Sequence, residues 1–164
     1  MTVIGLKMNN GFAGNTARQG DYISVTRPNG DNKPLIFGTP VVYGNDDSVI
    51  AWNAASTAAD FVGVVIDAVK SAFTFPATGA GSYAPNEAVA VFERGSLNVI
   101  NADNAAKLGT KVYIRTLAAA GKQIGDFEAT ADGTNNVLLS NAEWGGEADA
   151  NSVAELVLLS RNKA

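Results

Sequence analysis

Short hydrophobic runs, each bounded by Gly, Pro, Asn or Asp, follow one another along most of this chain. Runs of this length that are rich in Val, Ile, Tyr and Phe are typical of β-strands separated by turns. The clearest runs are residues 22–26, 35–37, 41–43, 61–66, 88–99, 111–116, 124–128, 137–139 and 153–159. About ten short strands, with turn signals about every 8–12 residues, predict an all-β fold, a small β-barrel or sandwich.

Two of these runs predict more than a strand. Residues 61–66 are apolar on both faces, so we expect a central strand there. Residues 88–99 are interrupted by Gly95, where we expect a kink and a β-bulge. The residues that we expect to be buried are the apolar members of the most strand-like runs: Val62, Val64, Val65, Val91, Val112, Tyr113 and Leu156.

A Gly-Thr sequence precedes a β-branched and aromatic run twice, in GTPVVY from Gly38 and in GTKVYI from Gly109. A later strand-like run with an internal glycine follows each copy, at Gly63 and at Gly125. A glycine inside a strand indicates a close backbone approach or a sharp corner. We expect two similar units that close on one core; the alternative is that Gly-Thr-x-Val simply recurs in β proteins.

Two segments do not fit the strand pattern. The sequence NADNAAKLG predicts one short helix near residues 103–108, with Asn101 or Asp103 as its N-cap and Gly109 as its left-handed end. Residues 1–19 show no sustained period and predict an extended N-terminal arm, followed by a single β-barrel-like domain over residues 20–164. We expect the arm to contribute little to the stability of this domain and much to attachment. Residues 51–60 fit either a helical turn or a loop.

Composition narrows the chemistry that the chain can perform. It contains no cysteine and no histidine, which excludes disulfides, thiol nucleophiles and Ser-His-Asp or Cys-His catalysis, and removes the usual zinc ligands. A net charge of −4 gives no electrostatic reason to expect a nucleic-acid partner. No apolar run approaches the ~20 residues of a membrane span, and the start lacks the apolar core of a signal peptide. We therefore expect no membrane partner and synthesis in the cytoplasm.

Three stretches invite a functional hypothesis, and none of them is specific. GAGSYA (residues 79–84) has the letters of a dinucleotide-binding turn, but Pro85 follows and a strand is expected instead of the required helix. Asp46-Asp47 and Glu147-Asp149 lack the ligand spacing of a calcium loop. Asp126 and Glu128 alternate on a predicted strand, where they would form a paired-carboxylate site. We expect no catalytic residue, no metal ligand and no cofactor.

The order of several weak motifs carries more information than any one of them. The motifs, in chain order, are Gly20-Asp21 before the first strand, GTPVV, FVGVV, EAVAVFERGSLNV, AAKLGTKVY, SNAEW (residues 140–144) and AELVLL, over residues 20–159. In this order the chain resembles the small capsid cement (decoration) proteins of tailed bacteriophages. The segments 44–60 and 68–85 are longer than in the family's usual compact versions, which makes them candidate binding elements.

The resemblance implies a structural protein of the virion that binds the outer surface of a capsid and bridges neighbouring major capsid subunits. It implies the major capsid protein as partner and a homotrimer on the shell. Aromatic and arginine side chains are the usual interface anchors. The candidate interface residues are Phe12, Arg18, Tyr22 and Trp144. The alternative for Trp144 is that it packs, like Trp52, on the protein's own core.

Two other functional classes stay open at this point. One is a different virion β module, a head-fibre or tail-associated domain that binds glycans, which a groove lined by exposed aromatic side chains would favour. The other is a carboxylate-based hydrolase, which two carboxylates in one cleft would favour.

Overall fold

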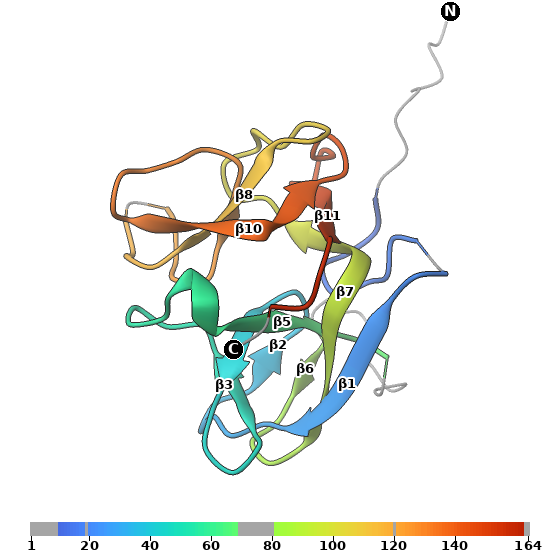
Figure 1. The fold of residues 1–164 in the computed structure, drawn as a ribbon, viewed down its shortest axis with the longest axis vertical. Helices are drawn as coiled ribbons and strands as arrows, with labels where there is room; N and C mark the ends of the chain where they lie inside the picture. Colours follow the sequence, from blue (N-terminus) through green and yellow to red (C-terminus); the bar gives the residue numbers. More distant parts are fainter. Residues whose placement is uncertain (1–9, 19, 69–80, 120, 163–164) are drawn as a thin grey trace, which may run out of the picture.

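The computed structural model of the protein describes residues 10–18, 20–68, 81–119 and 121–162, and these residues are nearly all β (Figure 1). The strands are β1 (Ile23–Pro28), β2 (Leu35–Ile36), β3 (Pro40–Tyr43), β4 (Val49–Ala51), β5 (Phe61–Ile66), β6 (Ser82–Tyr83), β7 (Ala88–Ile100), β8 (Lys111–Arg115), β9 (Phe127–Glu128), β10 (Asn136–Trp144) and β11 (Val153–Leu158). This confirms the predicted all-β fold. The described residues contain no helix long and apolar enough to cross a membrane.

Strand β7 connects two lobes. The main sheet has nine strands, in the order β4-β3-β5-β7-β11-β10-β8-β9 with β1 also on β7, while β2 and β6 pair separately. The first half of β7 pairs antiparallel with β1 and β5, and its second half pairs with β11. We call residues 20–68 and 81–94 the first lobe and residues 95–158 the second lobe. Figure 1 shows β7 passing from one lobe into the other.

Gly95 marks the change of partner within β7, as the sequence predicts. Its φ of +112° lies in a region that other residues rarely adopt. A Cβ atom there would lie 2.7 Å from the carbonyl oxygen of Asp21 and 2.9 Å from Cβ of Tyr22. The pairing of β1 with β7 shifts register opposite Glu93, next to this glycine. A kink with a bulge therefore turns the strand from the first lobe into the second.

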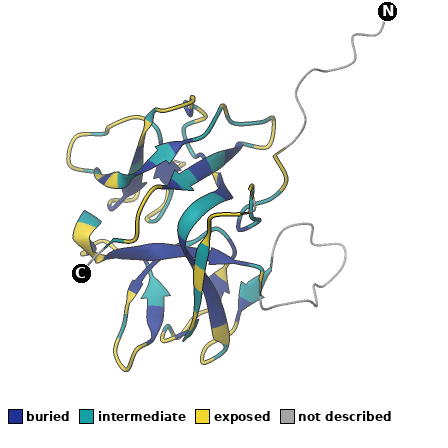
Figure 2. Ribbon diagram, turned by 45° about the vertical axis from the view of Figure 1, so that its right-hand side comes forward, coloured by how far each residue is buried: buried dark blue, intermediate teal, exposed yellow. Residues whose placement is uncertain are grey.

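Buried apolar side chains form two clusters, where the sequence analysis predicted one core. The larger cluster takes residues from both lobes, and the smaller one lies within the first lobe. Both are possible because β7 is buried on both faces: Val89 and Val91 belong to the smaller cluster, Ala90 and Phe92 to the larger. Figure 2 shows two buried stretches of this strand, separated by a partly buried bend.

The predicted core residues and the central strand β5 are confirmed with one exception. Val62, Val64, Val65, Val91, Val112 and Leu156 are buried, whereas Tyr113 is half-buried. Within β5, a Cβ on Gly63 would lie 2.3 Å from the carbonyl oxygen of Phe92, so the predicted close backbone approach is present. The expected strand at residues 124–128 is reduced to Phe127–Glu128.

The predicted helix near residues 103–108 is wrong; this segment forms turns. Asn104 has a φ of +51°, which interrupts a right-handed helix. The Asp103 carboxylate does accept the N–H of Ala105, but it also accepts those of Ala129 and Thr130, at 3.1 and 2.9 Å for its Oδ2. The Asp103 carboxylate thus binds the segment after β9 and does not cap a helix. Among the described residues the helical structure is a 3-10 turn, η1 (Ala58–Asp60), in the segment that the sequence left open.

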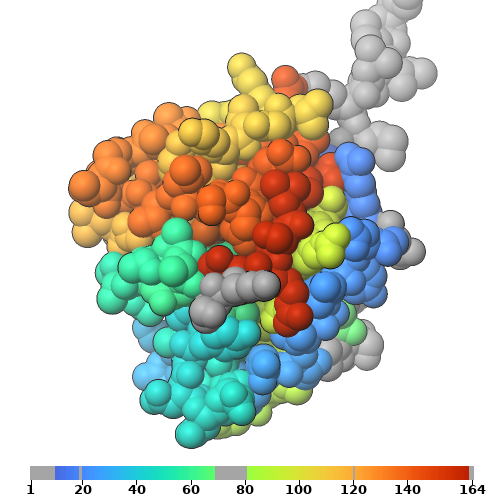
Figure 3. Space-filling model, in the orientation of Figure 1, coloured from blue at the N-terminus to red at the C-terminus, as the bar shows by residue number. Residues whose placement is uncertain are grey.

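The C-terminal segment returns from β11 to the first lobe. Arg161 Nε lies 2.6 Å from Oε2 of the buried Glu93 on β7. Nδ2 of Asn162 donates to the carbonyl oxygens of Ala58, Ala59 and Phe61. Figure 3 shows this segment, in red, crossing the surface toward the green residues of η1. It ties the two lobes together beside the pocket described below.

Candidate attachment surface

The described part of the N-terminal arm, residues 10–18, lies along one edge of β7. Leu97 pairs with Leu156 of β11 on one side and forms a bridge with Thr16 on the other. The Gly14 N–H donates to the Asn98 carbonyl at 2.8 Å, and the Asn98 N–H donates to the carbonyl of Asn15 at 2.8 Å. This half of β7 is therefore an interior strand, with β11 and the arm as its neighbours.

Side chains fasten the same segment at both ends. The Asn10 N–H donates to Oδ2 of Asp149 at 2.9 Å, and its Nδ2 donates to the Val153 carbonyl at 2.7 Å. Burial alone would raise the pKa of the Asp149 carboxyl, but hydrogen bonds from the backbone of Asn10, Val153 and Asn151 lower it overall. At the other end, Arg18 Nε lies 2.6 Å from Oε1 of Glu155. These contacts anchor residues 10–18 to the second lobe; residues 1–9 lie outside the described part.

The structure brings two of the predicted interface residues, Arg18 and Tyr22, to adjacent points on β7. The Arg18 N–H lies 3.5 Å from the Ser96 carbonyl, and its side chain is 70% exposed. Tyr22 packs beside Gly95, is 50% exposed, and stacks on Phe92 with ring centroids 5.8 Å apart. Each side chain is held on one side and accessible on the other. Phe12 is half-buried within the arm.

Trp144 does not belong to this surface. It is 0% exposed, and its Nε1 lies 3.4 Å from the Glu128 carbonyl oxygen within the larger cluster. Trp52 is also buried, and its Nε1 donates to the carbonyl of Arg115 at 3.1 Å. The alternative that both tryptophans pack on the protein's own core is correct. The reason is that β10 ends at Trp144 with this side chain on its inner face, whereas the motif alone suggested an exposed turn.

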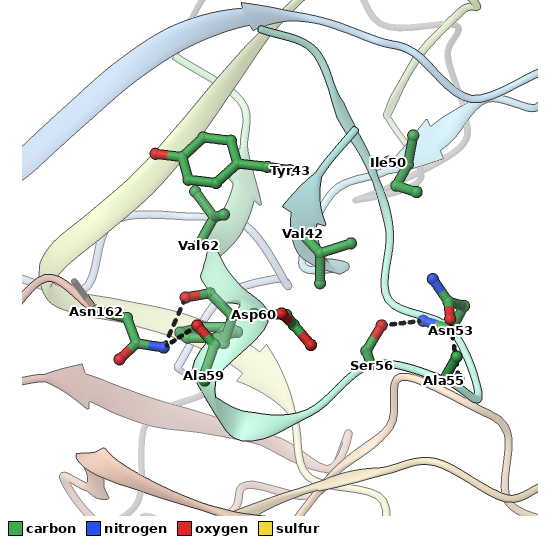
Figure 4. Close-up of a pocket in the computed structure, with 11 residues that line it drawn as sticks. Val42, Tyr43, Ile50, Asn53, Ala55, Ser56, Ala59, Asp60, Val62 and Asn162 are labelled. Carbon is green, nitrogen blue, oxygen red and sulfur yellow. Dashed lines mark hydrogen bonds between the residues drawn. The ribbon is translucent and has the colours of Figure 1, made fainter. Parts of the chain in front are cut away.

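A pocket of about 410 Å³ opens beside η1 in the first lobe (Figure 4). Its residues come from β3, β4, the loop before η1, η1 itself, β5 and the C-terminal segment: Val42, Tyr43, Ile50, Asn53, Ala55, Ser56, Ala59, Asp60, Phe61, Val62 and Asn162. The volume is within the range of small-molecule and side-chain binding sites. No motif in the sequence marks these residues as a site; the one signal is the length of the segment 44–60.

The polar side of this pocket is built by a local hydrogen-bonded turn. Asp60 Oδ2 accepts the backbone N–H and the side-chain hydroxyl of Thr57, both at 2.8 Å. These bonds lower the pKa of the Asp60 carboxyl. Ser56 and Asn53 hold the preceding turn, because the Asn53 N–H donates to Oγ of Ser56 at 3.1 Å. The chain thus fixes one charged carboxylate at an exposed, concave position.

The paired-carboxylate hypothesis for Asp126 and Glu128 does not agree with the structure. Asp126 Oδ2 accepts the Gln123 N–H at 2.7 Å in a turn that precedes β9. Glu128 is buried and makes ion pairs with Arg115 and Lys122 at 3.0 and 2.6 Å. The two residues have different partners because β9 begins only at Phe127, so the strand alternation on which the hypothesis rested is absent.

The other two stretches also have structural roles. Ser82 and Tyr83 form β6 against β2, and a turn follows them where a dinucleotide-binding motif requires a helix; residues 79–80 lie outside the described part. Asp46 and Asp47 occupy the exposed tip of the β3–β4 hairpin, with φ values of +54° and +59°. Within the described residues, no three His, Cys, Asp or Glu side chains gather in a way that suits a metal ion.

The chain is similar to known phage proteins in both sequence and fold. Residues 2–159 match a phage cement family, described as "Structural cement protein (E217 gp24/Pam3 gp6)". A chain in the solved capsid of Myoviridae phage XM1 shares the fold, with a TM-score of 0.68 and 18% identity over 98% of this chain and 97% of that one. The N base of head fiber gp8.5 of bacteriophage phi29 aligns with a TM-score of 0.45 and 13% identity, over 88% of this chain and 100% of that one. No curated protein matches the chain.

Proposed function

We propose, since this chain belongs to the family of phage structural cement proteins, that it binds the outer surface of a bacteriophage capsid and bridges neighbouring major capsid subunits. The observation that carries the proposal is the family match over residues 2–159, which includes both lobes and the arm. In this function the protein stabilises the shell by adding contacts between subunits. It acts without a catalytic residue or a cofactor.

The described surface supports attachment through the arm side of β7. Arg18 and Tyr22 are exposed there and are held in position by Glu155 and Phe92, so their ordering costs little upon binding. Phe12 lies on the same anchored segment as Arg18. We propose that these three residues belong to the interface with the capsid or with a second subunit. Val3, Ile4 and Leu6 precede this segment in the sequence, and we propose that they add apolar contacts when the protein binds.

We also propose a homotrimer as the form that acts on the shell. Three copies on one lattice site bind with a high effective concentration once the first copy is attached. Strong single contacts are then unnecessary, which agrees with the few exposed aromatic side chains on this surface. In this proposal the protein is synthesised in the host cytoplasm and then binds to the outer surface of the virion.

Co-sedimentation with shells assembled from the phage's own major capsid protein tests the proposal. The full chain is expected to pellet with shells and to raise their disassembly temperature, because bridging contacts must break before subunits leave. A double variant Arg18→Ser/Tyr22→Ser should weaken binding about tenfold, that is about 1.4 kcal/mol. A matched change on the hairpin tip, Asp46→Ser/Asp47→Ser, should not.

Two results would contradict the proposal. One is a wild-type protein that stays in the supernatant at saturating shell concentration. The other is binding of a defined sugar in a glycan screen together with no binding to shells, which would favour the head-fibre or tail-associated module.

A further inference from the structure

The pocket beside η1 combines an apolar wall with one carboxylate. Val42, Ile50 and Val62 supply the wall, and Asp60 stands opposite. Figure 4 shows the Asp60 carboxylate between Val42 and Ser56, in the middle of the hollow. Tyr43, which is 47% exposed, lies at the end of the apolar wall. A ligand that fills the pocket must therefore be apolar along its length and cationic at one end.

Asp60 is charged, and one of its two carboxylate oxygens is available to a further hydrogen-bond donor. Both bonds from Thr57 go to Oδ2, so Oδ1 has no hydrogen-bond partner among the described residues. No lysine or arginine of the described part forms an ion pair with it. A carboxylate accepts several hydrogen bonds through its two oxygens, which leaves Oδ1 for a donor from outside.

Asn162 closes one side of the pocket. Its Nδ2 donates to the carbonyl oxygens of Ala58, Ala59 and Phe61, and Figure 4 shows its amide oxygen turned away from Asp60. The acceptor that faces a ligand is therefore the Asp60 carboxylate.

We propose that this pocket receives a lysine or arginine side chain from the capsid surface, so the inference rests on the proposed function and names a chemical determinant of that contact. The aliphatic stem lies on Val42, Ile50 and Val62, while the cationic end pairs with Asp60. Tyr43 borders the same wall, and its ring already lies 5.9 Å from the guanidinium carbon of Arg27, so Asp60 supplies the charge that recognises the ligand.

The first experiment uses the free protein, so that it does not depend on the shell. Nα-acetyl-arginine amide and Nα-acetyl-lysine amide are titrated into the full chain, with amide and methyl NMR shifts as the readout and uncharged Nα-acetyl-norleucine amide as the control probe. At least one of the two cationic probes should shift the NMR signals of Val42, Ile50 and Asp60. Asp60→Asn should weaken this binding about tenfold, since Asn keeps the bond from the Thr57 N–H but loses the charge.

The matched control variant is Asp46→Asn, which removes one charge from the same lobe outside the pocket and preserves a left-handed position that Asn tolerates. It should change probe affinity by less than about twofold, because Asp46 does not line the pocket and water and salt screen an exposed charge. Equal binding of the norleucine probe, or equal losses in Asp46→Asn and Asp60→Asn, would overturn the inference.

Lys163 follows Asn162 in the sequence, so the chain's own lysine is a competing occupant. The titration is therefore repeated with Lys163→Ala. An affinity within about threefold of wild type supports an external occupant. A larger increase would show that the protein's own tail fills the pocket, and would overturn the inference.

The second experiment measures shell binding. Asp60→Asn should weaken it about fivefold, and Ala59→Arg, which places a competing cation on the pocket wall, about tenfold. If wild type binds shells and both variants bind equally well, the inference is wrong and the proposed function stands. If wild type does not bind shells, the proposed function fails, and the titration still decides the chemistry of the pocket.

Discussion

Arg115 and Glu128 form an ion pair that is wholly removed from solvent, with 0% of either side chain exposed. Arg115 Nη2 contacts both carboxylate oxygens, at 3.0 and 3.2 Å, and Nε contacts Oε1 at 3.1 Å. Asn136 Nδ2 donates to Oε2 at 2.6 Å, and Lys122 approaches Oε1. The pair thus joins β8 to β9, and Asn136 connects it to the first residue of β10.

We predict that Glu128→Ala destabilises the protein by about 3–5 kcal/mol, because it leaves the buried guanidinium with the partly exposed Asp132 as its one remaining ion-pair partner among the described residues. Arg115→Met/Glu128→Leu should cost less than either single loss, since it removes both charges and keeps the volume. Urea unfolding measures both values. A double variant as unstable as Glu128→Ala would show that the pair contributes favourable energy beyond mutual neutralisation.

Gly95→Ala should destabilise the protein by on the order of 1–3 kcal/mol, and it should also reduce shell binding. The added Cβ meets the Asp21 carbonyl and Tyr22, so the arm side of β7 must shift. Gly133→Ala is the control: its φ is also positive, but no atom lies within 4 Å of its Cβ position. Thermal unfolding of both variants checks the difference, and equal losses would contradict a role for the close contact.

The arm should divide into two functional parts. Deletion of residues 1–9 is expected to leave the thermal transition within a few degrees while weakening shell binding about tenfold. Deletion of residues 1–18 also removes the backbone bonds of Gly14, Asn15 and Ala17 to β7, each worth about 0.5–1.5 kcal/mol. The longer deletion should therefore lower the transition clearly. Calorimetry and co-sedimentation of both truncations test this, and identical thermal transitions would contradict it.

Acid should weaken the contact between Asp103 and the segment after β9. Burial raises the pKa of the Asp103 carboxyl, but hydrogen bonds from Ala129, Ala105 and Thr130 lower it overall. A lowered folded-state pKa means that the stabilisation is fully present above the unfolded value of about 3.9 and is lost as the pH falls through the folded value.

Unfolding free energies measured from pH 6 to pH 2.5 check this prediction, with Asp103→Ala as the comparison. The difference between wild type and variant should shrink below about pH 4. A difference that stays constant over the whole range would contradict a contribution from the ionised form.

Sequence by itself determined the all-β class, the central position of β5 and the bend at Gly95. These features depend on the spacing of apolar residues and on the backbone conformations that single residue types allow, and both can be deduced from the sequence. The same holds for the buried valines, because an apolar side chain gains free energy mainly by leaving water for the core.

Only the tertiary structure decided the polar and terminal features. Asp103 could cap a helix or accept bonds from a distant strand, and it accepts from both its own turn and Ala129. Trp144 could anchor an interface or fill the core, and it fills the core. The Asp60 pocket joins η1 to Asn162, about a hundred residues later in the chain. Each outcome depends on which partners the fold brings within hydrogen-bonding or packing distance, and a residue's own type and its sequence neighbours do not contain that information.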